Sequence, residues 1–153
     1  MKILVMSDSH GNKKAILRAV ETELPSLILH LGDHDADCAD LAGSFPEIPV
    51  RCVRGNCDIM SRGADTSEFT FGGKKFFMTH GHLYGVKRGL YPIINSASKS
   101  GVDILLFGHT HIPHCETDGT LSIVNPGSVS TGEKTYAVLE ITDGAVECVI
   151  KKI

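Results

Sequence analysis

The first part of the chain alternates short apolar runs with segments of helical periodicity. The apolar runs are rich in Ile, Val and Leu and short, which is typical of strands covered on both faces. They are Lys2–Met6, Leu27–Leu31 and Val50–Val53. The segments between them predict a helix over Lys13–Leu24, with Asn12 as its cap and Pro25 after its end, and a weaker helix over Asp37–Gly43. This order favours βαβ units and a parallel sheet.

The later part of the chain predicts a second sheet. Phe69–Phe71 and Lys74–Thr79 flank a Gly-Gly pair and favour a hairpin. A helix is predicted over Lys87–Ser100, closed by Gly101, and a strand over Ile104–Phe107. Short strands separated by hairpin signals at Asp118-Gly119 and Asp143-Gly144 follow: Cys115–Glu116, Thr120–Val124, Tyr136–Ile141 and Val146–Ile150. We therefore predict an α/β fold of one domain, residues 1–153, with two stacked sheets flanked by helices.

Composition narrows the classes of partner. The net charge of -3 comes from acidic and basic residues spread along the chain, so no basic stripe indicates a polynucleotide. The first apolar run is too short for a signal peptide, and no run approaches the roughly 18 apolar residues of a membrane span. A cytoplasmic protein without a membrane partner is the expectation. Because the five cysteines are odd in number and lack CxxC spacing, we predict reduced thiols and no structural zinc site.

Five segments share one arrangement, in which an apolar strand is followed by polar side chains that bind metals. The segments are Asp8-Ser9-His10, Gly32-Asp33, Gly55-Asn56, His80-Gly81-His82 and Gly108-His109-Thr110-His111. In open α/β sheets, ligands bind at the carboxyl ends of the strands, so these groups are expected at one edge. The glycines before Asp33, Asn56 and His109 allow the backbone to turn sharply and to approach an ion closely.

The mixture of imidazole, carboxylate and amide side chains suits Mn, Fe, Zn or Ni better than Ca or Mg. Seven side chains exceed what one ion needs, whereas two ions about 3.5–4 Å apart with one bridging carboxylate would use them all. The two carboxylates and a bridging hydroxide cancel three of the four positive charges of two such ions. The remaining charge favours an anionic substrate such as a phosphate ester.

The same motifs, in the same order, resemble those of the calcineurin-like metallophosphoesterase superfamily. The short length and three further motifs resemble its small YfcE-type branch of phosphodiesterases: Gly55-Asn56-Cys57-Asp58, Thr79-His80-Gly81-His82 and Asn125-Pro126-Gly127-Ser128. The resemblance covers essentially the whole chain. It implies a four-layer αββα sandwich of two mixed sheets, and a hydrolase of small phosphate diesters that uses two divalent ions, usually Mn.

Carried onto this chain, the resemblance also implies individual roles. Asp8, His10 and His111 would hold the first ion. Asn56, His80 and His109 would hold the second, and Asp33 would bridge the two. A hydroxide shared by the ions would attack phosphorus in line. His10, Asn56 and His109 are thus both predicted ligands and candidate catalytic residues.

Cys57 departs from the family pattern, because many members have a histidine directly after the Gly-Asn pair. A neutral thiol is a poor proton donor, so leaving groups of lower pKa, or protonation by water or His82, become more plausible. If His82 does not donate this proton, three roles stay open for it: it contacts the substrate phosphate, it positions a metal ligand, or it is an ordinary loop histidine.

The remaining candidate residues favour ordinary structural roles. His30 is predicted to be a hydrogen-bonded core residue, while His34 and Asp37 are predicted to be solvated. Arg54 and the Lys87-Arg88 pair could reach a substrate phosphate, although solvation is favoured. Cys115 and Cys148 are predicted to fill the core.

Three other functions stay open at this point. A phosphomonoesterase would use the same site. A non-catalytic scaffold, like the retromer subunit that resembles this fold, is less favoured because this sequence keeps a full set of ligands. A nuclease would have to bind its polymer through the metals alone. An exposed edge of the terminal strands is compatible with a homo-oligomer.

Overall fold

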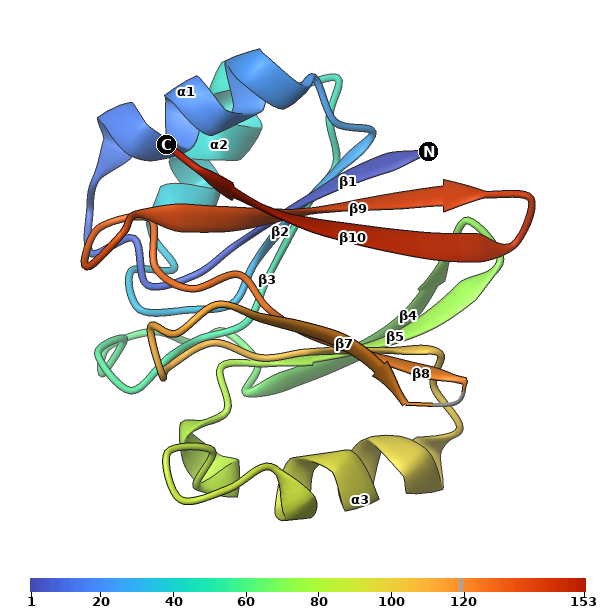
Figure 1. Cartoon of the computed structure of the whole chain (residues 1–153). Helices are drawn as coiled ribbons and strands as arrows, with labels where there is room; N and C mark the ends of the chain where they lie inside the picture. The colour runs from blue at the N-terminus through green and yellow to red at the C-terminus, as the bar shows by residue number, and fades with distance from the viewer. Residues whose placement is uncertain (119) are drawn as a thin grey trace.

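The computed structural model describes residues 1–118 and 120–153, so the predicted Asp118-Gly119 turn lies outside the described residues. The strands form two five-stranded sheets, which stack face to face (Figure 1). Helices α1 (Lys13–Glu23) and α2 (Asp37–Ser44) cover the outer face of one sheet, and α3 (Tyr91–Ser100) covers the outer face of the other. The predicted four-layer αββα sandwich of mixed sheets is confirmed.

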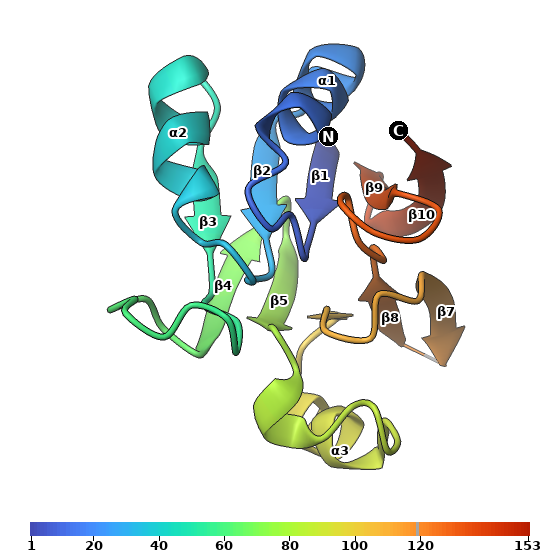
Figure 2. The ribbon, with the colours of Figure 1, turned by 90° about the vertical axis from the view of Figure 1, so that its left-hand side faces the viewer.

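Sheet one has the strand order β10-β9-β1-β2-β3. Its parallel part is formed by β1 (Lys2–Met6), β2 (Leu27–His30) and β3 (Val50–Cys52), as the βαβ pattern predicts. The antiparallel hairpin of β9 (Thr135–Thr142) and β10 (Ala145–Lys152) extends the sheet beside β1. In Figure 2 the arrowheads of β1, β2 and β3, which mark their carboxyl ends, all point the same way, down toward the other sheet.

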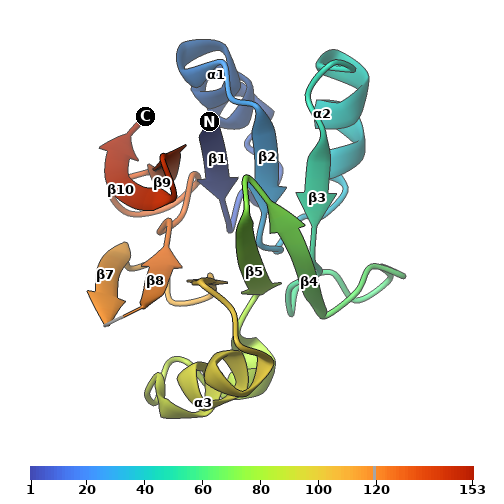
Figure 3. The same ribbon diagram turned by 90° about the vertical axis from the view of Figure 1, so that its right-hand side faces the viewer.

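Sheet two has the order β4-β5-β6-β8-β7. The hairpin of β4 (Thr66–Phe71) and β5 (Lys74–Thr79) is longer than its apolar residues alone predict. Strands β5, β6 (Ile104–Leu106) and β8 (Leu121–Asn125) run parallel, and β7 (His114–Asp118) pairs antiparallel with β8 at the edge. Figure 3 shows both hairpins, β9-β10 and β4-β5, from the opposite side.

Local sequence explains the helix boundaries. The Asn12 side chain accepts a hydrogen bond from the Ala15 N–H and so caps α1, while Leu24 adopts the left-handed conformation before Pro25. The helix predicted from Lys87 is shorter at its start, because α3 begins only at Tyr91. Gly89 has a φ of 154°, which no helix accommodates, and a short 3₁₀ turn (η1, His82–Tyr84) precedes it.

Three apolar clusters hold the four layers together. The cluster between the sheets contains alternate residues of both, such as Val5, Leu29, Met78 and Leu106. A second cluster packs α1 and α2 on sheet one, and a third packs α3 on sheet two. Burial on both faces explains why the central strands read as continuous apolar runs. Among the described residues, no helix is long and apolar enough to span a bilayer.

The prediction of reduced cysteines is wrong for one pair. Cys38 of α2 and Cys52 of β3 form a disulfide, with their Cα atoms 6.6 Å apart. They are 14 positions apart in the sequence, and the βαβ crossover brings α2 back over β3. Cys57, Cys115 and Cys148 are free. Cys115 is exposed rather than part of the core, because β7 is an edge strand.

Candidate metal centre

The chemistry-bearing side chains meet at one edge of the sandwich. Loops after strands of sheet one carry four of the seven predicted ligands, Asp8, His10, Asp33 and Asn56. Loops after strands of sheet two carry the other three, His80, His109 and His111. The parallel strands β1, β2 and β3 and the parallel strands β5 and β6 all end at this edge.

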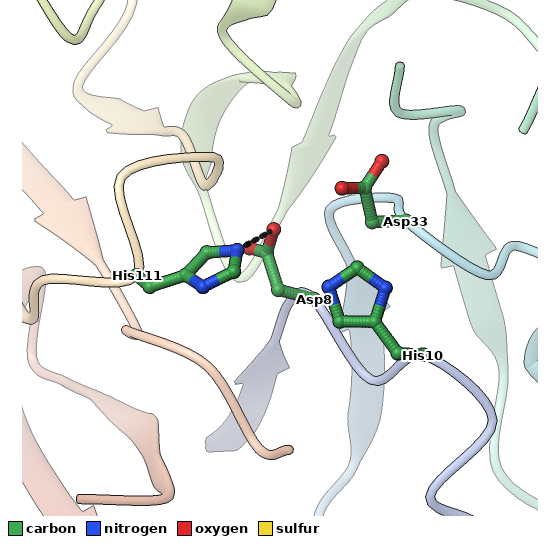
Figure 4. A group of neighbouring side chains, drawn as sticks. All are labelled: Asp8, His10, Asp33 and His111. Atoms are coloured by element: carbon green, nitrogen blue, oxygen red, sulfur yellow. Dashed lines mark ion pairs between the residues drawn. The ribbon is translucent and has the colours of Figure 1, made fainter. Parts of the chain in front are cut away.

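One group of four side chains surrounds a common point. Each of Asp8, His10, Asp33 and His111 offers one ligand atom, and these atoms lie within 4.8 Å of one another. Figure 4 shows the side chains converging from three loops. Asp8 is 0% exposed and Asp33 3% exposed, whereas His10 is exposed. A buried carboxylate at the base and an imidazole at the surface make a site that is open on one side.

A second group lies beside the first. The Nε2 atom of His80 is 3.2 Å from Asn56 Oδ1 and 3.2 Å from His109 Nδ1. The same His80 atom is 3.5 Å from Asp33 Oδ1. The Asp33 carboxylate therefore contributes to the first group and also lies near the second.

Hydrogen bonds outside the site determine which nitrogen of His80 faces it. His80 Nδ1 lies 2.8 Å from the carbonyl oxygen of Leu31, which can only accept a hydrogen bond, so Nδ1 carries the proton. In the neutral imidazole, which is the form that binds metals, Nε2 is then unprotonated and faces the amide oxygen of Asn56 at 3.2 Å. Two acceptors at this distance repel each other unless a cation lies between them. This donor set fits a metal ion.

Asp8 leads to the same conclusion in the first group. Its Oδ2 accepts hydrogen bonds from the Ser7 hydroxyl at 2.5 Å and from the His109 N–H at 3.2 Å. Its Oδ1 is buried without a hydrogen-bond partner among the described residues, although His111 Nε2 is only 2.9 Å away. A buried carboxylate oxygen without a partner is costly, and a bound cation would satisfy it.

The backbone at this edge is strained. Five of the seven predicted ligands have positive φ angles between 45° and 67°: Asp8, His10, Asp33, His109 and His111. Residues other than glycine rarely adopt this left-handed region, and such strain clusters at functional sites. The surrounding fold therefore holds these side chains in one place at a conformational cost.

Two glycines let the loops come close enough. A Cβ on Gly55 would overlap the carboxylate of Asp33, and a Cβ on Gly108 would overlap the Ser7 hydroxyl. The glycines thus allow loops of the site to approach one another across the sheet edge. This contact between loops differs from the close approach to an ion expected from the sequence.

The electrostatics favour the neutral form of His109 and His82. Burial, together with repulsion from His80 and Lys87, lowers the pKa of His109 to about 4. Burial and His80 also lower the pKa of His82. Neutral imidazole is the form that binds metals. By contrast, partial burial and the neighbouring Asp33 carboxylate raise the pKa of the Cys57 thiol to about 11, so the thiol is protonated at neutral pH.

His82 and Cys57 both lie beside the predicted ligands. The His82 ring centroid is 5.4 Å from that of His80 and 6.1 Å from that of His109. Cys57 is exposed, and its N–H donates to Asp33 Oδ1 at 2.9 Å. Contacts of this kind are compatible with a substrate or supporting role for either residue, and their roles stay predictions.

The structure sorts the remaining candidates. His30 is fully buried, lies 2.9 Å from the Ser9 hydroxyl and accepts the Gly32 N–H, as predicted for a core histidine. The prediction of a solvated Asp37 is wrong, because it is 0% exposed and accepts from the Ser9 hydroxyl at 2.6 Å. His34, at 3.0 Å from Asp37, covers it on the solvent side.

The Arg54 side chain is held in an ion pair with Asp65. Its guanidinium donates two hydrogen bonds to the Asp65 carboxylate, at 2.7 and 3.2 Å.

Asn125 and Ser128 were placed near the site only by the resemblance, and the structure shows that both contact the loops that carry the predicted ligands. Asn125 donates to the Gly108 carbonyl at 3.0 Å, and Ser128 donates to the Asp8 carbonyl at 2.9 Å.

Two supporting residues were missed from the sequence. The Asp58 carboxylate accepts four backbone N–H groups, from Asp33, His34, Asp35 and Gly55, at 2.7–3.0 Å. Burial opposes its ionised form, but these hydrogen bonds keep the Asp58 pKa below its ordinary value. Asp58 directly follows Asn56-Cys57 in the sequence motif, and this position could have indicated that it supports the site. Thr131, whose hydroxyl lies 2.9 Å from His111 Nδ1, carried no such signal.

Comparison with known proteins agrees with this geometry. The model of the calcineurin-like phosphoesterase superfamily domain matches residues 1–144. The probable metallophosphoesterase YsnB of Bacillus subtilis is 33% identical over 153 residues, covering 95% of this chain and 87% of that protein. The phosphodiesterase YfcE of Escherichia coli is 32% identical over 154 residues, covering 85% of this chain and 80% of that protein.

Solved structures agree with the fold. A conserved protein of Streptococcus pneumoniae, described as a predicted phosphoesterase, superposes with a TM-score of 0.83 at 27% identity, covering 99% of this chain and 88% of the other. Vps29 of Entamoeba histolytica, in complex with zinc, superposes with a TM-score of 0.79 at 23% identity over 99% of both chains, a likeness of fold alone. The chain therefore belongs to the calcineurin-like phosphoesterase superfamily and is a hydrolase of the metallophosphoesterase class.

Proposed function

We propose that this protein hydrolyses small phosphate diesters at a site that holds two divalent metal ions. The observation that carries the proposal is the pair of adjacent ligand groups that share the Asp33 carboxylate. The first ion would be held by Asp8, His10 and His111, and the second by Asn56, His80 and His109, with Asp33 between them. When bound, such ions supply positive charge to the phosphate oxygens and make water a stronger nucleophile.

The chain's own residues prepare the site in two ways. Asp8 and Asp33 bring two negative charges to the buried base of the site, and histidines bound to a metal through neutral imidazole add none. Two divalent ions therefore leave net positive charge at an open edge, which favours an anionic ester. Nitrogen and oxygen ligands without thiolate support Mn as the ion, with Fe, Zn or Ni as alternatives.

Two features favour diesters over monoesters. Arg54 is paired with Asp65, so it does not offer its charge to the second negative charge of a monoester. The Cys57 thiol, with a pKa of about 11, is a weak proton donor to a leaving alkoxide at neutral pH. Substrates whose leaving groups need little protonation are therefore favoured.

A substrate panel tests the proposal. The purified protein with added Mn would be assayed on bis-aryl and mono-aryl phosphates of matched leaving group, with metal content measured in parallel. We expect about two divalent ions per chain and faster turnover of the diesters. Asp33→Asn is expected to lower the rate by more than about 100-fold, whereas Asp103→Asn, just before the amino end of β6 and so at the opposite end of that strand from the site, serves as a control with an unchanged rate. Dominant monoester turnover would instead support a phosphomonoesterase with the same site.

A second experiment tests the part played by Cys57. Cys57→His introduces a group that titrates near neutral pH and would donate a proton to the leaving oxygen. We expect the rate to rise more for alkyl than for aryl leaving groups, because alkoxides need more help. If Cys57→His left the rate unchanged for both aryl and alkyl leaving groups, this interpretation would be contradicted.

The scaffold alternative makes the opposite prediction. A non-catalytic protein of this fold would contain little divalent metal and show no hydrolysis stimulated by Mn. Asp8 Oδ1, which has no hydrogen-bond partner in the part of the chain that the structure describes, and the facing acceptors of His80 and Asn56 favour a site that binds metal. A cytoplasmic location, a small-molecule substrate and a homo-oligomeric state stay predictions.

A further inference from the structure

A row of hydroxyl groups connects His111 to the backbone of Asp8 on the side away from the proposed ion. His111 Nδ1 lies 2.9 Å from Thr131 Oγ1, and Thr131 Oγ1 lies 3.0 Å from Ser128 Oγ. Ser128 Oγ lies 2.9 Å from the Asp8 carbonyl oxygen. The two hydroxyls belong to the loop between β8 and β9, which joins sheet two to sheet one.

The carbonyl acceptor at one end of this row favours one direction for its hydrogen bonds. The Asp8 carbonyl can only accept, so the single Ser128 hydroxyl proton points to it. Ser128 Oγ, whose own proton is used, is then the acceptor of the Thr131 hydroxyl at 3.0 Å. The N–H groups of Ser130 and Thr131, at 3.1 and 3.0 Å, share the same oxygen, so its two lone pairs serve three donors. Because the Thr131 proton is directed to Ser128, its oxygen accepts from His111 Nδ1–H.

The other side of the imidazole agrees with this direction. His111 Nε2 is 2.9 Å from Asp8 Oδ1, yet that oxygen has no hydrogen-bond partner with acceptable geometry among the described residues. A proton on Nε2 would thus point poorly at the carboxylate. An unprotonated Nε2 next to a carboxylate oxygen is the arrangement of two ligands to one cation (Figure 4).

We propose that Thr131 is a positioning residue which, through Ser128, holds His111 with its Nδ1 protonated and its Nε2 directed at the ion beside Asp8. The inference rests on the metal site of the proposed function, but the tautomer of His111 exists without the metal. His111 is itself partly exposed and has a φ of 59°, and its Nδ1 contacts the Thr131 hydroxyl at 2.9 Å. Thr131 contacts no substrate in this proposal.

The test uses the full-length protein in three variants. Thr131→Val keeps the shape but removes the hydroxyl, Thr131→Ser restores it, and Ser130→Ala changes a neighbour that reaches Ser128 through its backbone N–H. Nitrogen-15 NMR of the metal-free protein reports which His111 nitrogen carries the proton. Titration calorimetry with Mn reports affinity, and thermal unfolding of the metal-free protein checks that each variant is folded.

We expect Thr131→Val to lose the single Nδ1-protonated form and to bind the first ion about 10-fold or more weakly. Thr131→Ser and Ser130→Ala are expected to stay within about 3-fold of the parent, well below that loss. An unchanged tautomer and affinity in Thr131→Val, or equal losses in all three variants, would overturn the inference. If the parent protein binds no metal, the proposed function fails, and the tautomer of the metal-free protein alone decides the role of Thr131.

Discussion

Asp8 lies at the end of β1 with one carboxylate oxygen bonded and the other buried without a hydrogen-bond partner among the described residues. A group kept in this state lowers the stability of the metal-free fold. Its neighbour His111 cannot relieve the cost, because its Nε2 is inferred to be unprotonated. The residue is therefore arranged for a ligand rather than for the stability of the metal-free protein.

Replacing Asp8 with Asn should separate these two effects. The amide oxygen would keep the hydrogen bonds from Ser7 and His109, while a neutral NH₂ would replace the buried carboxylate oxygen that has no hydrogen-bond partner among the described residues. We expect the metal-free variant to be more stable by about 1–3 kcal/mol and to bind the first ion much more weakly. Chemical denaturation and calorimetry with Mn would measure both. A metal-free variant less stable than its parent would show that Asp8 is not under strain.

Asp58 supports the site through the backbone of two loops. Its Oδ1 accepts the N–H groups of His34 and Asp35, and its Oδ2 accepts those of Asp33 and Gly55. One carboxylate thus links the loop that follows β2 to the loop that follows β3. The distance between Asp33 and the second group of ligands depends on this link.

Asp58→Asn should weaken the link without removing the side chain. The amide NH₂ cannot accept, so two of the four N–H groups lose their partner, at a cost of about 3 kcal/mol. We also expect Mn affinity to fall about 10-fold, since the loop with Asp33 is no longer held. Asp103→Asn is the matched control, because its carboxylate accepts the Lys75 N–H at 2.7 Å far from the metal centre. Equal metal affinity in Asp58→Asn and Asp103→Asn would contradict a role for Asp58 at the site.

At the scale of elements, α1 is joined to sheet one by a buried carboxylate. Glu23, at the end of the helix, accepts from the Tyr136 hydroxyl of β9 at 2.8 Å and from Lys151 of β10 at 2.9 Å. Burial alone would raise the Glu23 pKa, but these partners hold it below its ordinary value of 4.5. Burial and the same carboxylate raise the pKa of Tyr136 to about 12.

This ion pair predicts a pH dependence of stability. Because the folded pKa of Glu23 is lower than the unfolded value, its contribution is complete above pH 4.5 and is lost as the pH falls through the folded pKa. We expect Glu23→Gln to cost about 1–2 kcal/mol at pH 7 and progressively less below pH 4.5. Urea unfolding at several pH values would measure the difference. A difference that is constant with pH would mean that the charge of Glu23 contributes nothing.

At the scale of the whole molecule, the metal centre lies where the two sheets meet. Sheet one supplies Asp8 and Asp33 and sheet two supplies His80 and His109, so a bound ion would connect both halves of the sandwich. The apolar core between the sheets continues behind the site and keeps the loops in register. Metal binding and the stability of the fold should therefore be linked.

The linkage predicts a shift of the melting temperature. An ion that binds only the folded protein adds about 2.7 kcal/mol when its concentration is 100 times its Kd, which for a chain of this size raises the melting temperature by about 5–10 °C. Scanning calorimetry with Mn, and again after chelation, would measure the shift. Asp33→Asn should reduce it. A melting temperature that does not respond to any divalent ion would contradict the proposed metal centre.

The sequence by itself determined the strands, the helices and the candidate ligands. Continuous apolar runs occur only where a strand is covered on both faces, and Asn12, Pro25 and the glycine turns act through local backbone geometry, so these features are readable along the chain. Boundaries shifted where longer-range packing decides them, as at the start of α3 and in the length of β4. The resemblance of the motifs identified the superfamily before any geometry was known.

Only the tertiary structure decided which side chains support the site. Asp58 and Thr131 act on residues 25 and 20 positions away in the sequence, at Asp33 and His111, through hydrogen bonds that exist because separate loops meet. The burial of Asp37 and the Cys38–Cys52 disulfide have the same origin in the return of α2 over sheet one. Contacts between loops depend on how whole sheets stack, and no local periodicity encodes them.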